Sequence, residues 1–234
     1  MQRLLILAVL SSTLPAAHAD LVLVQRIEGT SQNGTMTTLR LKGSKLRVDL
    51  ASRAGPVSFV MDLETGGALT LRHDEKVMTR VSGAQAKESS EALRKEAGKK
   101  PETGAGKPEA AGRREKIGEF NTEVFTWNGV NGRQTIWVTK DLPNYAKVKE
   151  QCDRLSKSAF ANVLQGAGPD LTALPGVVVK TELEREGKKF TMTVLSVKDE
   201  EQNPAHFEAS PDYRELEKRA KPKATPPAEP TPAR

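Results

Sequence analysis

Hydrophobic and polar residues alternate along most of this chain. Residues 45–50 read Lys-Leu-Arg-Val-Asp-Leu, with three aliphatic side chains on one face and three charged ones on the other. A period of two predicts a β-strand with one buried face and one face in water. The same pattern, broken by Asn-Gly, Gly-Gly and similar turns, predicts ten strands in all. They are 21–28, 35–42, 45–50, 57–63, 68–72, 76–81, 122–127, 134–139, 177–185 and 189–198.

One stretch changes to a helical period. Pro143 suits the first turn of a helix, where its missing N–H has no partner to lose. After it, apolar residues recur at steps of three and four: Tyr145, Val148, Cys152, Leu155, Ala159 and Val163. This stripe predicts an amphipathic helix over 145–164, capped at Gly166. Because the stripe needs cover and a sheet is the only large partner, we expect the helix to lie across the concave face as a lid.

These elements predict an α+β fold that is mostly β. We expect an antiparallel sheet of about ten strands, covered by the one amphipathic helix. Residues 20–213 form a single domain in this interpretation, and residues 214–234 form a disordered, proline-rich tail.

The segment 82–116 departs from the strand pattern and is rich in charge, proline and glycine. We predict a flexible insertion, whose first half has helical residues but almost no apolar face. Deleting 84–114 is expected to leave the fold intact, because shortening a flexible loop changes its closure entropy by only about 1 kcal/mol.

Residues 1–19 have the features of a signal peptide. Arg3 supplies the positive charge, Leu4–Leu10 the apolar core, and Ala17-His18-Ala19 an A-x-A cleavage pattern before Asp20. No cysteine follows the cleavage site to carry a lipid anchor, and no later run has the length of a membrane span. We therefore predict a periplasmic protein without an integral membrane segment after cleavage, with secretion as the alternative.

The formal net charge is +6, which raises the question of a nucleic-acid partner. The excess lies in the signal peptide, in 82–116 and in 211–234, so the rest of the chain carries no net charge. Basic flexible segments around a neutral domain do not make a binding stripe, and we expect no nucleic-acid partner.

Few residues are suited to catalysis or metal binding. The single cysteine, Cys152, excludes a framework of internal disulfides. After signal cleavage only two histidines remain, His73 and His206, so a zinc site would also need carboxylate ligands. His73 lies at a turn and is expected to be solvated, and His206 to be structural. Since no Ser/His/Asp set can be assembled, we predict no catalytic residues, no cofactor, no metal and no enzyme.

Four segments resemble a known family: GEFNTEVFTWNG at 118–129, TIWVTKDLPNY at 135–145, LPGVVVKTEL at 174–183 and NPAHFEASPDY at 203–213. From about Leu21 to Tyr213 the chain resembles the domain-of-unknown-function 4412 family. That family is similar to the LolA-like outer-membrane lipoprotein-sorting proteins. The resemblance implies that the sheet is strongly curved, as an antiparallel half-barrel of about ten strands with a helical lid and an apolar hollow.

An apolar hollow is where lipid-like ligands bind. The side chains proposed to line it are Phe59, Met61, Phe125, Trp127, Trp137 and Leu155. The leading hypothesis is a non-catalytic envelope protein that binds a lipid or a lipoprotein acyl chain. One alternative is an envelope interaction module with a filled core, in which these residues are ordinary core and the sheet edge or tails hold a protein partner. The other alternative is a hydrolase with an unrecognised site.

Overall fold

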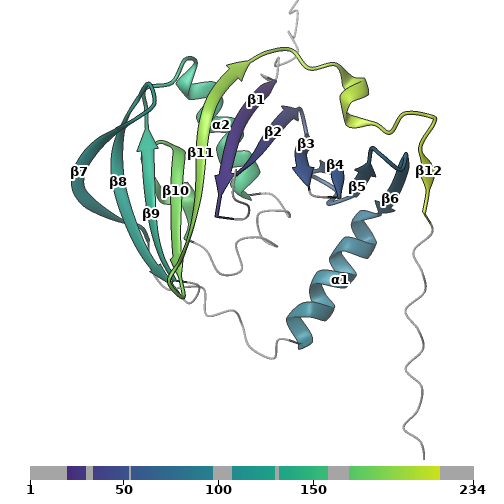
Figure 1. The fold of residues 1–234 in the computed structure, drawn as a ribbon, viewed down its shortest axis with the longest axis horizontal. Coiled ribbons are helices and arrows are strands. Elements are labelled where there is room, and N and C mark those ends of the chain that lie inside the picture. The colour runs from purple at the N-terminus through teal and green to yellow at the C-terminus, as the bar shows by residue number, and fades with distance from the viewer. Residues whose placement is uncertain are drawn as a thin grey trace, which may run out of the picture.

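A computed structural model describes residues 20–29, 34–52, 54–96, 107–129, 132–157 and 169–216. Within these ranges the strands form one 12-stranded sheet, and two α-helices lie beside it (Figure 1). The strands are β1 (Leu21–Glu28), β2 (Thr35–Lys42), β3 (Lys45–Ser52), β4 (Gly55–Asp62), β5 (Ala68–Arg72), β6 (Val77–Val81), β7 (Glu109–Ile117), β8 (Phe120–Gly129), β9 (Gly132–Thr139), β10 (Val177–Arg185), β11 (Lys188–Asp199) and β12 (Arg214–Glu215). The α-helices are α1 (Gly83–Glu96) and α2 (Tyr145–Lys157), and the 3₁₀ turns are η1 (Leu171–Ala173) and η2 (Pro204–Phe207).

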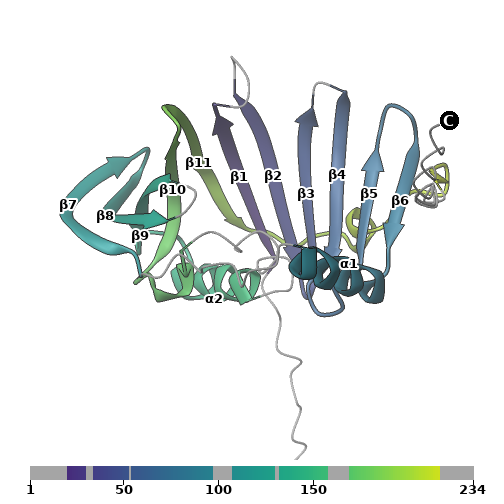
Figure 2. The same ribbon diagram turned by 90° about the horizontal axis from the view of Figure 1, so that it is seen from below.

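The sheet is open, with β12 at one edge and β7 at the other, in the order β12-β6-β5-β4-β3-β2-β1-β11-β10-β9-β8-β7. Neighbouring strands are antiparallel except for the short parallel pair of β12 and β6. Figure 2 shows the sheet curving, with α1 and α2 both on its inner side. Neither described helix is long and apolar enough to cross a membrane.

The predicted strands are all present, as β1 to β6 and β8 to β11, which confirms a mostly β, curved antiparallel sheet with few helices. The prediction for 82–116 is wrong in part, since this segment contains α1 and β7. The sequence pattern does not predict β7, because an edge strand needs no alternation of apolar and polar residues. Its residues from Glu109 to Arg114 are all exposed, so backbone pairing with β8 holds it in place without an apolar face.

The same segment is a crossover rather than a loop insertion. β6 lies next to one edge of the sheet and β7 forms the other edge, so the chain between them must pass from one end of the sheet to the other. The two views agree on this separation (Figures 1 and 2).

α2 covers one face of the sheet, called the α2 face here. Val148 is 1% exposed, and Tyr145, Cys152 and Leu155 pack beside it. They contact a core of side chains from seven strands: Leu21, Leu23, Leu41, Leu46, Val124, Trp137, Val177, Val179 and Val194. The helix begins at the predicted residue, whereas its predicted final turns and the Gly166 cap lie outside the described residues.

The other face of the sheet, called the outer face here, has two smaller apolar clusters. On β4 and β5, Val60, Leu69 and Leu71 are covered by Phe207, which belongs to the C-terminal segment 200–216. On β8 to β10, Phe125, Ile136 and Val138 are covered by Leu174. The sheet is therefore packed on both faces, by different parts of the chain.

Candidate functional site

The six predicted lining residues divide between the two faces of the sheet. Trp137 and Leu155 belong to the core under α2. Phe59 and Met61 pair with Val48 and Leu46, which also pack in that core, so they point to the α2 face. These four residues are on the face where the sequence analysis expects a hollow.

The other two residues lie on the outer face. Phe125 is 8% exposed and packs with Ile136 and Leu174, and Trp127 is two residues further along the same strand. The ring of Trp127 lies directly over Gly129, where a Cβ atom would collide with it. Phe125 and Trp127 therefore fill a core of their own and do not line one hollow together with Trp137.

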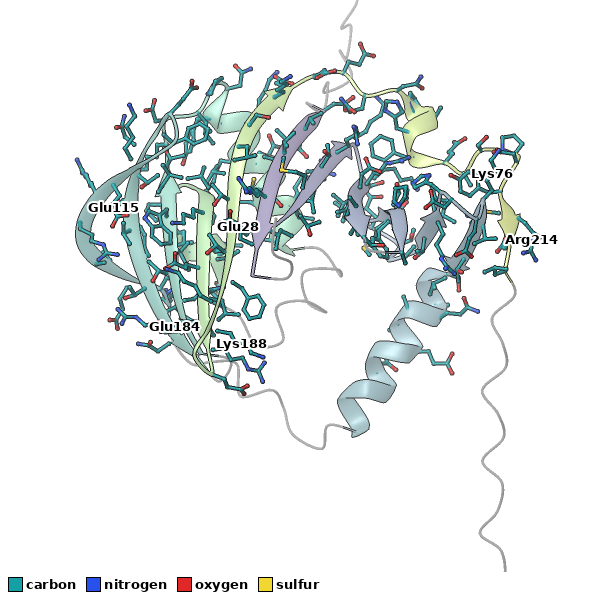
Figure 3. The ribbon with its side chains drawn as sticks, in the orientation of Figure 1. Glu28, Lys76, Glu115, Glu184, Lys188 and Arg214 are labelled. Carbon is teal, nitrogen blue, oxygen red and sulfur yellow. The ribbon has the colours of Figure 1, made fainter. Side chains whose placement is uncertain are left out.

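Trp137 is also fully engaged in packing. It is 4% exposed, its Nε1 donates a hydrogen bond of 2.8 Å to Glu115 Oε2, and Lys180 Nζ lies 4.2 Å from the ring centroid. Figure 3 places Glu115 on β7, so this hydrogen bond ties the edge strand to the middle of the β8–β9 pair. Trp137 is a core residue with a cation–π contact rather than an open ligand surface.

Phe59 differs from the other predicted residues because 43% of it is exposed. It belongs to the middle one of three cross-strand pairs on the α2 face of β3 and β4: Leu50 with Val57, Val48 with Phe59, and Leu46 with Met61. Leu50, Val57 and Met61 are each half-buried. We call Val48, Leu50, Val57, Phe59 and Met61 the Phe59 patch.

The sequence analysis missed a hydrogen-bonded network on the outer face. Ser58 Oγ lies 2.5 Å from Asp49 Oδ1 and 2.6 Å from His73 Nε2, and His73 Nδ1 lies 2.5 Å from the Tyr213 hydroxyl. Tyr213 and His73 are also in edge-to-face contact, with their rings at 87°. The network joins β3, β4, the turn after β5 and the C-terminal segment.

Two arginines complete this network around Asp49. Arg47 donates to Asp49 Oδ1 at 2.6 Å, to Ser58 Oγ at 2.9 Å and to the His206 carbonyl at 2.5 Å. Arg40 donates to Asp49 Oδ2. Burial raises the pKa of Asp49, but the hydrogen bonds from Ser58 and Arg47 and the two positive charges outweigh it, so the pKa lies below its ordinary value.

The Ser58–His73 distance is within the range for a nucleophile and its base. Ser58 is 1% exposed, however, and its Oγ already has three polar partners. His73 also contacts a tyrosine rather than the carboxylate that orients the base in a catalytic triad. The arrangement is that of a structural clamp, which attaches the C-terminal segment to the sheet.

The prediction that His73 is solvated is wrong, since it is half-buried and has a partner at each ring nitrogen. Part of this network was readable from the sequence, because alternation and register place Asp49 opposite Ser58 on neighbouring strands. The contact between His73 and Tyr213 joins residues 140 positions apart, and no local pattern indicates it.

Two cavities open on the outer side of the sheet. One, of about 640 Å³, lies between the C-terminal segment and β2 to β6 and is called the strap cleft here. The other, of about 330 Å³, is a shallow hollow beside Ser58 and His73. Tyr213 lines the first and His73 the second, so their hydrogen bond separates the two.

Metal and thiol chemistry receive no support from the described residues. Among them, no three His, Cys, Asp or Glu side chains gather into a possible metal site. Burial, followed by the neighbouring charge of Asp153, raises the pKa of the Cys152 thiol to about 11. A thiol with that pKa is almost wholly protonated at neutral pH and is a poor nucleophile.

The sequence matches the family described as "Domain of unknown function (DUF4412)" over residues 24–213, which is most of the chain. The protein belongs to this family. The match ends at Tyr213, so the DUF4412 region includes the residue that clamps the C-terminal segment to the sheet. Among curated proteins, none matches the sequence.

The DUF4412 chain is similar in fold to an uncharacterised conserved protein from Thermus thermophilus. The TM-score is 0.52 at 7% sequence identity, and the match covers 85% of this chain and 90% of the other. Two structures of PNGF-II have TM-scores of 0.40 and 0.41 at 12% and 13% identity, and the match covers 31% and 32% of those chains. At these identities the first likeness shows the fold alone, and the other two are too weak to support an argument.

Proposed function

We propose that this DUF4412 protein is a non-catalytic, exported envelope protein that binds an apolar ligand, a lipid or lipoprotein acyl chain, on the α2 face of its sheet. The supporting observation is the Phe59 patch. An aromatic side chain that is 43% exposed there adjoins the core that α2 covers. A LolA-like half-barrel with a helical lid is part of the same proposal, and the curved open sheet with α2 on its inner side is consistent with it.

Contiguous exposed apolar surface on a soluble protein marks a binding site more often than an isolated side chain does. Covering the exposed part of Phe59 would contribute roughly 1 kcal/mol, a fraction of the value for a fully buried phenylalanine. The rest of the Phe59 patch would add to this, because its members are only half-buried. A chain-like apolar ligand lying along β3 and β4 would cover all side chains of the Phe59 patch at once.

A polar atom beside the patch fits a ligand that also has a polar end. Thr37 is 5% exposed, pairs with Leu50, and its Oγ1 has no hydrogen-bond partner among the described residues. A buried hydroxyl without a partner costs about 1–3 kcal/mol. The hydroxyl lies below the surface of the sheet, so an ester or headgroup oxygen of a bound lipid would supply the missing partner once the side chains above it move apart.

Export is proposed from the signal-like residues 1–19. Asp20, the first residue after the expected cleavage, is 7% exposed. Its carboxylate accepts hydrogen bonds from Lys42 Nζ at 2.8 Å and from the Gln202 backbone N–H at 2.7 Å. Cleavage after Ala19 would thus keep the side chain that anchors the first strand. Sequencing the mature protein should find Asp20 first, and a retained segment 1–19 would contradict the proposal.

The binding test uses an uncharged fluorescent probe, N-phenyl-1-naphthylamine, together with mass spectrometry of organic extracts from protein purified from its native envelope. Phe59→Ser should weaken probe binding several-fold. Met36→Ser is the matched control, because Met36 is 48% exposed but lies on the other face of β2. Equal affinities of the two variants would contradict the proposal. A protein that yields neither extracted lipid nor probe binding would favour the interaction module instead.

A further inference from the structure

The strap cleft lies on the face of the sheet opposite to the Phe59 patch. Figure 1 shows the C-terminal segment passing over the outside of the sheet, away from α2. The volume of about 640 Å³ is within the range of roughly 300–1,000 Å³ found for small-molecule sites. Nothing in the proposed function uses this cleft.

The apolar part of the cleft comes from both of its walls. Leu69 and Met78 belong to the sheet, and Phe207 belongs to the C-terminal segment. Leu69 is 6% exposed and Phe207 is 7% exposed, so they form a packed floor rather than a loose surface. Such a floor favours an apolar group on whatever occupies the cleft.

The charged part of the lining is mainly cationic. Lys42, Lys45 and Arg80 line the cleft, and Glu208 is the one carboxylate among the described lining residues. Each of these cations has an acidic neighbour outside the lining: Lys42 Nζ lies 2.8 Å from Asp20, Lys45 Nζ lies 2.5 Å from Asp62, and Arg80 Nε lies 3.8 Å from Glu215. The side chains of Lys45 and Arg80 are nevertheless 48% and 57% exposed, so both can also reach an acid group in the cleft.

The outer wall of the cleft is held in place. Tyr213 hydrogen-bonds to His73 at 2.5 Å, Arg47 donates to the His206 carbonyl, and Lys76 Nζ pairs with Asp212 at 2.7 Å. Figure 3 places Lys76 beside Arg214, where the backbone N–H of Arg214 donates to the Lys76 carbonyl at 2.9 Å. A wall fixed at several points needs little ordering when a ligand binds.

We propose that the strap cleft binds an anionic amphiphile. Its apolar chain packs against Leu69, Met78 and Phe207, and its carboxylate or phosphate lies at the cationic rim. The acid group distinguishes this ligand from a purely apolar one, because without it the rim cations gain nothing from binding.

Decanoate is the first probe, with decyl phosphate as the second acid and 1-decanol as the uncharged comparison. Binding is followed by backbone amide shifts of isotope-labelled full-length protein. The expected shifts are centred on Phe207 and Tyr213, with 1-decanol at least ten-fold weaker than either acid. The preferred acid identifies the headgroup class. If neither acid shifts these amides, or if 1-decanol binds as well as the acids, the proposal is wrong.

The variants test the floor and the rim separately. Met78→Trp fills the cleft and should abolish binding, and the double variant Lys45→Gln/Arg80→Gln should weaken it at least ten-fold. The control is Lys140→Gln/Lys188→Gln, which removes two exposed positive charges elsewhere, with Lys188 at the far end of the β10–β11 hairpin (Figure 3). If Met78→Trp lowers the melting temperature, its loss of binding is not informative, and the double variant alone tests the proposal. Unchanged binding in the double variant would overturn the proposal.

Phe59→Ser separates this inference from the proposed function. The variant should leave decanoate binding unchanged, because Phe59 points to the α2 face. If it removes decanoate binding instead, the acid binds on the α2 face, and the strap-cleft site is wrong while the proposed function stands. If it weakens only the uncharged probe, both proposals hold.

Discussion

At the scale of single residues, Asp49 is the shared acceptor of the network on the outer face. Asp49→Asn would leave Arg40 and Arg47 without their shared carboxylate and weaken the bond that Ser58 donates. Hydrogen bonds to charged groups contribute about 1.5–3 kcal/mol, so the free energy of unfolding should fall by about that amount in urea titrations. Glu186→Gln is the control, because Glu186 has 78% of its side chain exposed and should change stability by less than about 0.5 kcal/mol.

A second prediction at this scale concerns pH. Burial raises the pKa of Asp62, but hydrogen bonds from Lys45 and from the Thr65 and Glu64 backbones outweigh it and lower the pKa to about 2. Because this is below the unfolded value, the stabilisation is complete above pH ~4 and is lost as the pH falls toward 2. Carboxyl NMR titration should show this pKa directly. In Lys45→Gln it should move back toward the ordinary value, and an unchanged pKa would contradict the role of Lys45.

The residue scale also shows where sequence patterns stop being informative. Alternation groups the side chains of one strand by face, and it correctly puts Phe59 with Met61 on one strand and Leu46 with Val48 on another. It does not say which side chains of different strands share a face. Phe125 and Trp137 are on neighbouring strands but on opposite faces, because Phe125 pairs with Ile136 and Val124 pairs with Trp137.

At the scale of elements, Val148 is the most deeply buried of the described residues of α2. Leu155 was predicted to be buried at mid-stripe, yet it is only partly buried, so Leu155→Ala should cost less than the 2–5 kcal/mol of a fully packed leucine. Val148 is 1% exposed, and Val148→Asp would place a charge in the core and should release the helix.

The reactivity of the Cys152 thiol can show whether α2 has detached from the sheet in Val148→Asp. Its pKa of about 11 leaves roughly a thousandth of the thiol ionised at pH 8, so Ellman's reagent should react slowly with the native protein. Val148→Asp should accelerate the reaction many-fold by exposing the thiol. Ala146→Asp, at an exposed position of the same helix, is the control and should react like the parent. Equal rates in all three proteins would show that α2 docking does not protect the thiol.

The elements that the sequence predicted are those with an apolar face. Ten strands and the start of α2 have one, and each was found near its expected bounds. β7 and β12 do not, since β7 is mostly exposed and β12 is two exposed residues paired with β6. Both are held by backbone hydrogen bonds to a neighbour that only the tertiary structure supplies.

At the scale of the whole molecule, the sequence does not reveal which strands are neighbours. The first strand pairs with β11 as well as with β2, so the two parts of the chain on either side of 82–108 join in one sheet. The pairing places Asp20 beside Gln202 and carries the C-terminal segment onto the outer face. The strap cleft and the clamp around His73 follow from this strand order. A sheet in which each strand paired only with the next one in sequence would have neither.

The strand order also changes what deletion of 84–114 should do. Ten inter-strand steps separate β6 from β7, which is about 48 Å along the curved sheet at roughly 4.8 Å per step. After the deletion, only residues 82 and 83 would connect Val81 to Glu115, with a reach of about 11 Å. The deletion also removes Glu109–Arg114 of β7 itself, and what remains, residues 115–117, could not pair with β8. Ile117 would leave the core, and Trp137 would lose its bond to Glu115. We therefore expect a melting temperature several degrees lower and altered tryptophan fluorescence.

Replacing 84–106 with a Gly/Ser linker of equal length separates chain reach from the packing of α1. Such a linker of 23 residues has a root-mean-square span of about 26 Å and can extend much further, so β7 can still reach β8. The first turn of α1 lies against the turn between β4 and β5, with Gly83 beside Thr65. Because the linker keeps Gly83, we expect the replacement to melt within a few degrees of the parent. The amides of 115–117, which both variants keep, should stay protected from hydrogen exchange in the replacement and lose that protection in the deletion. If both variants lose protection, α1 itself positions β7, and if neither does, the crossover is dispensable.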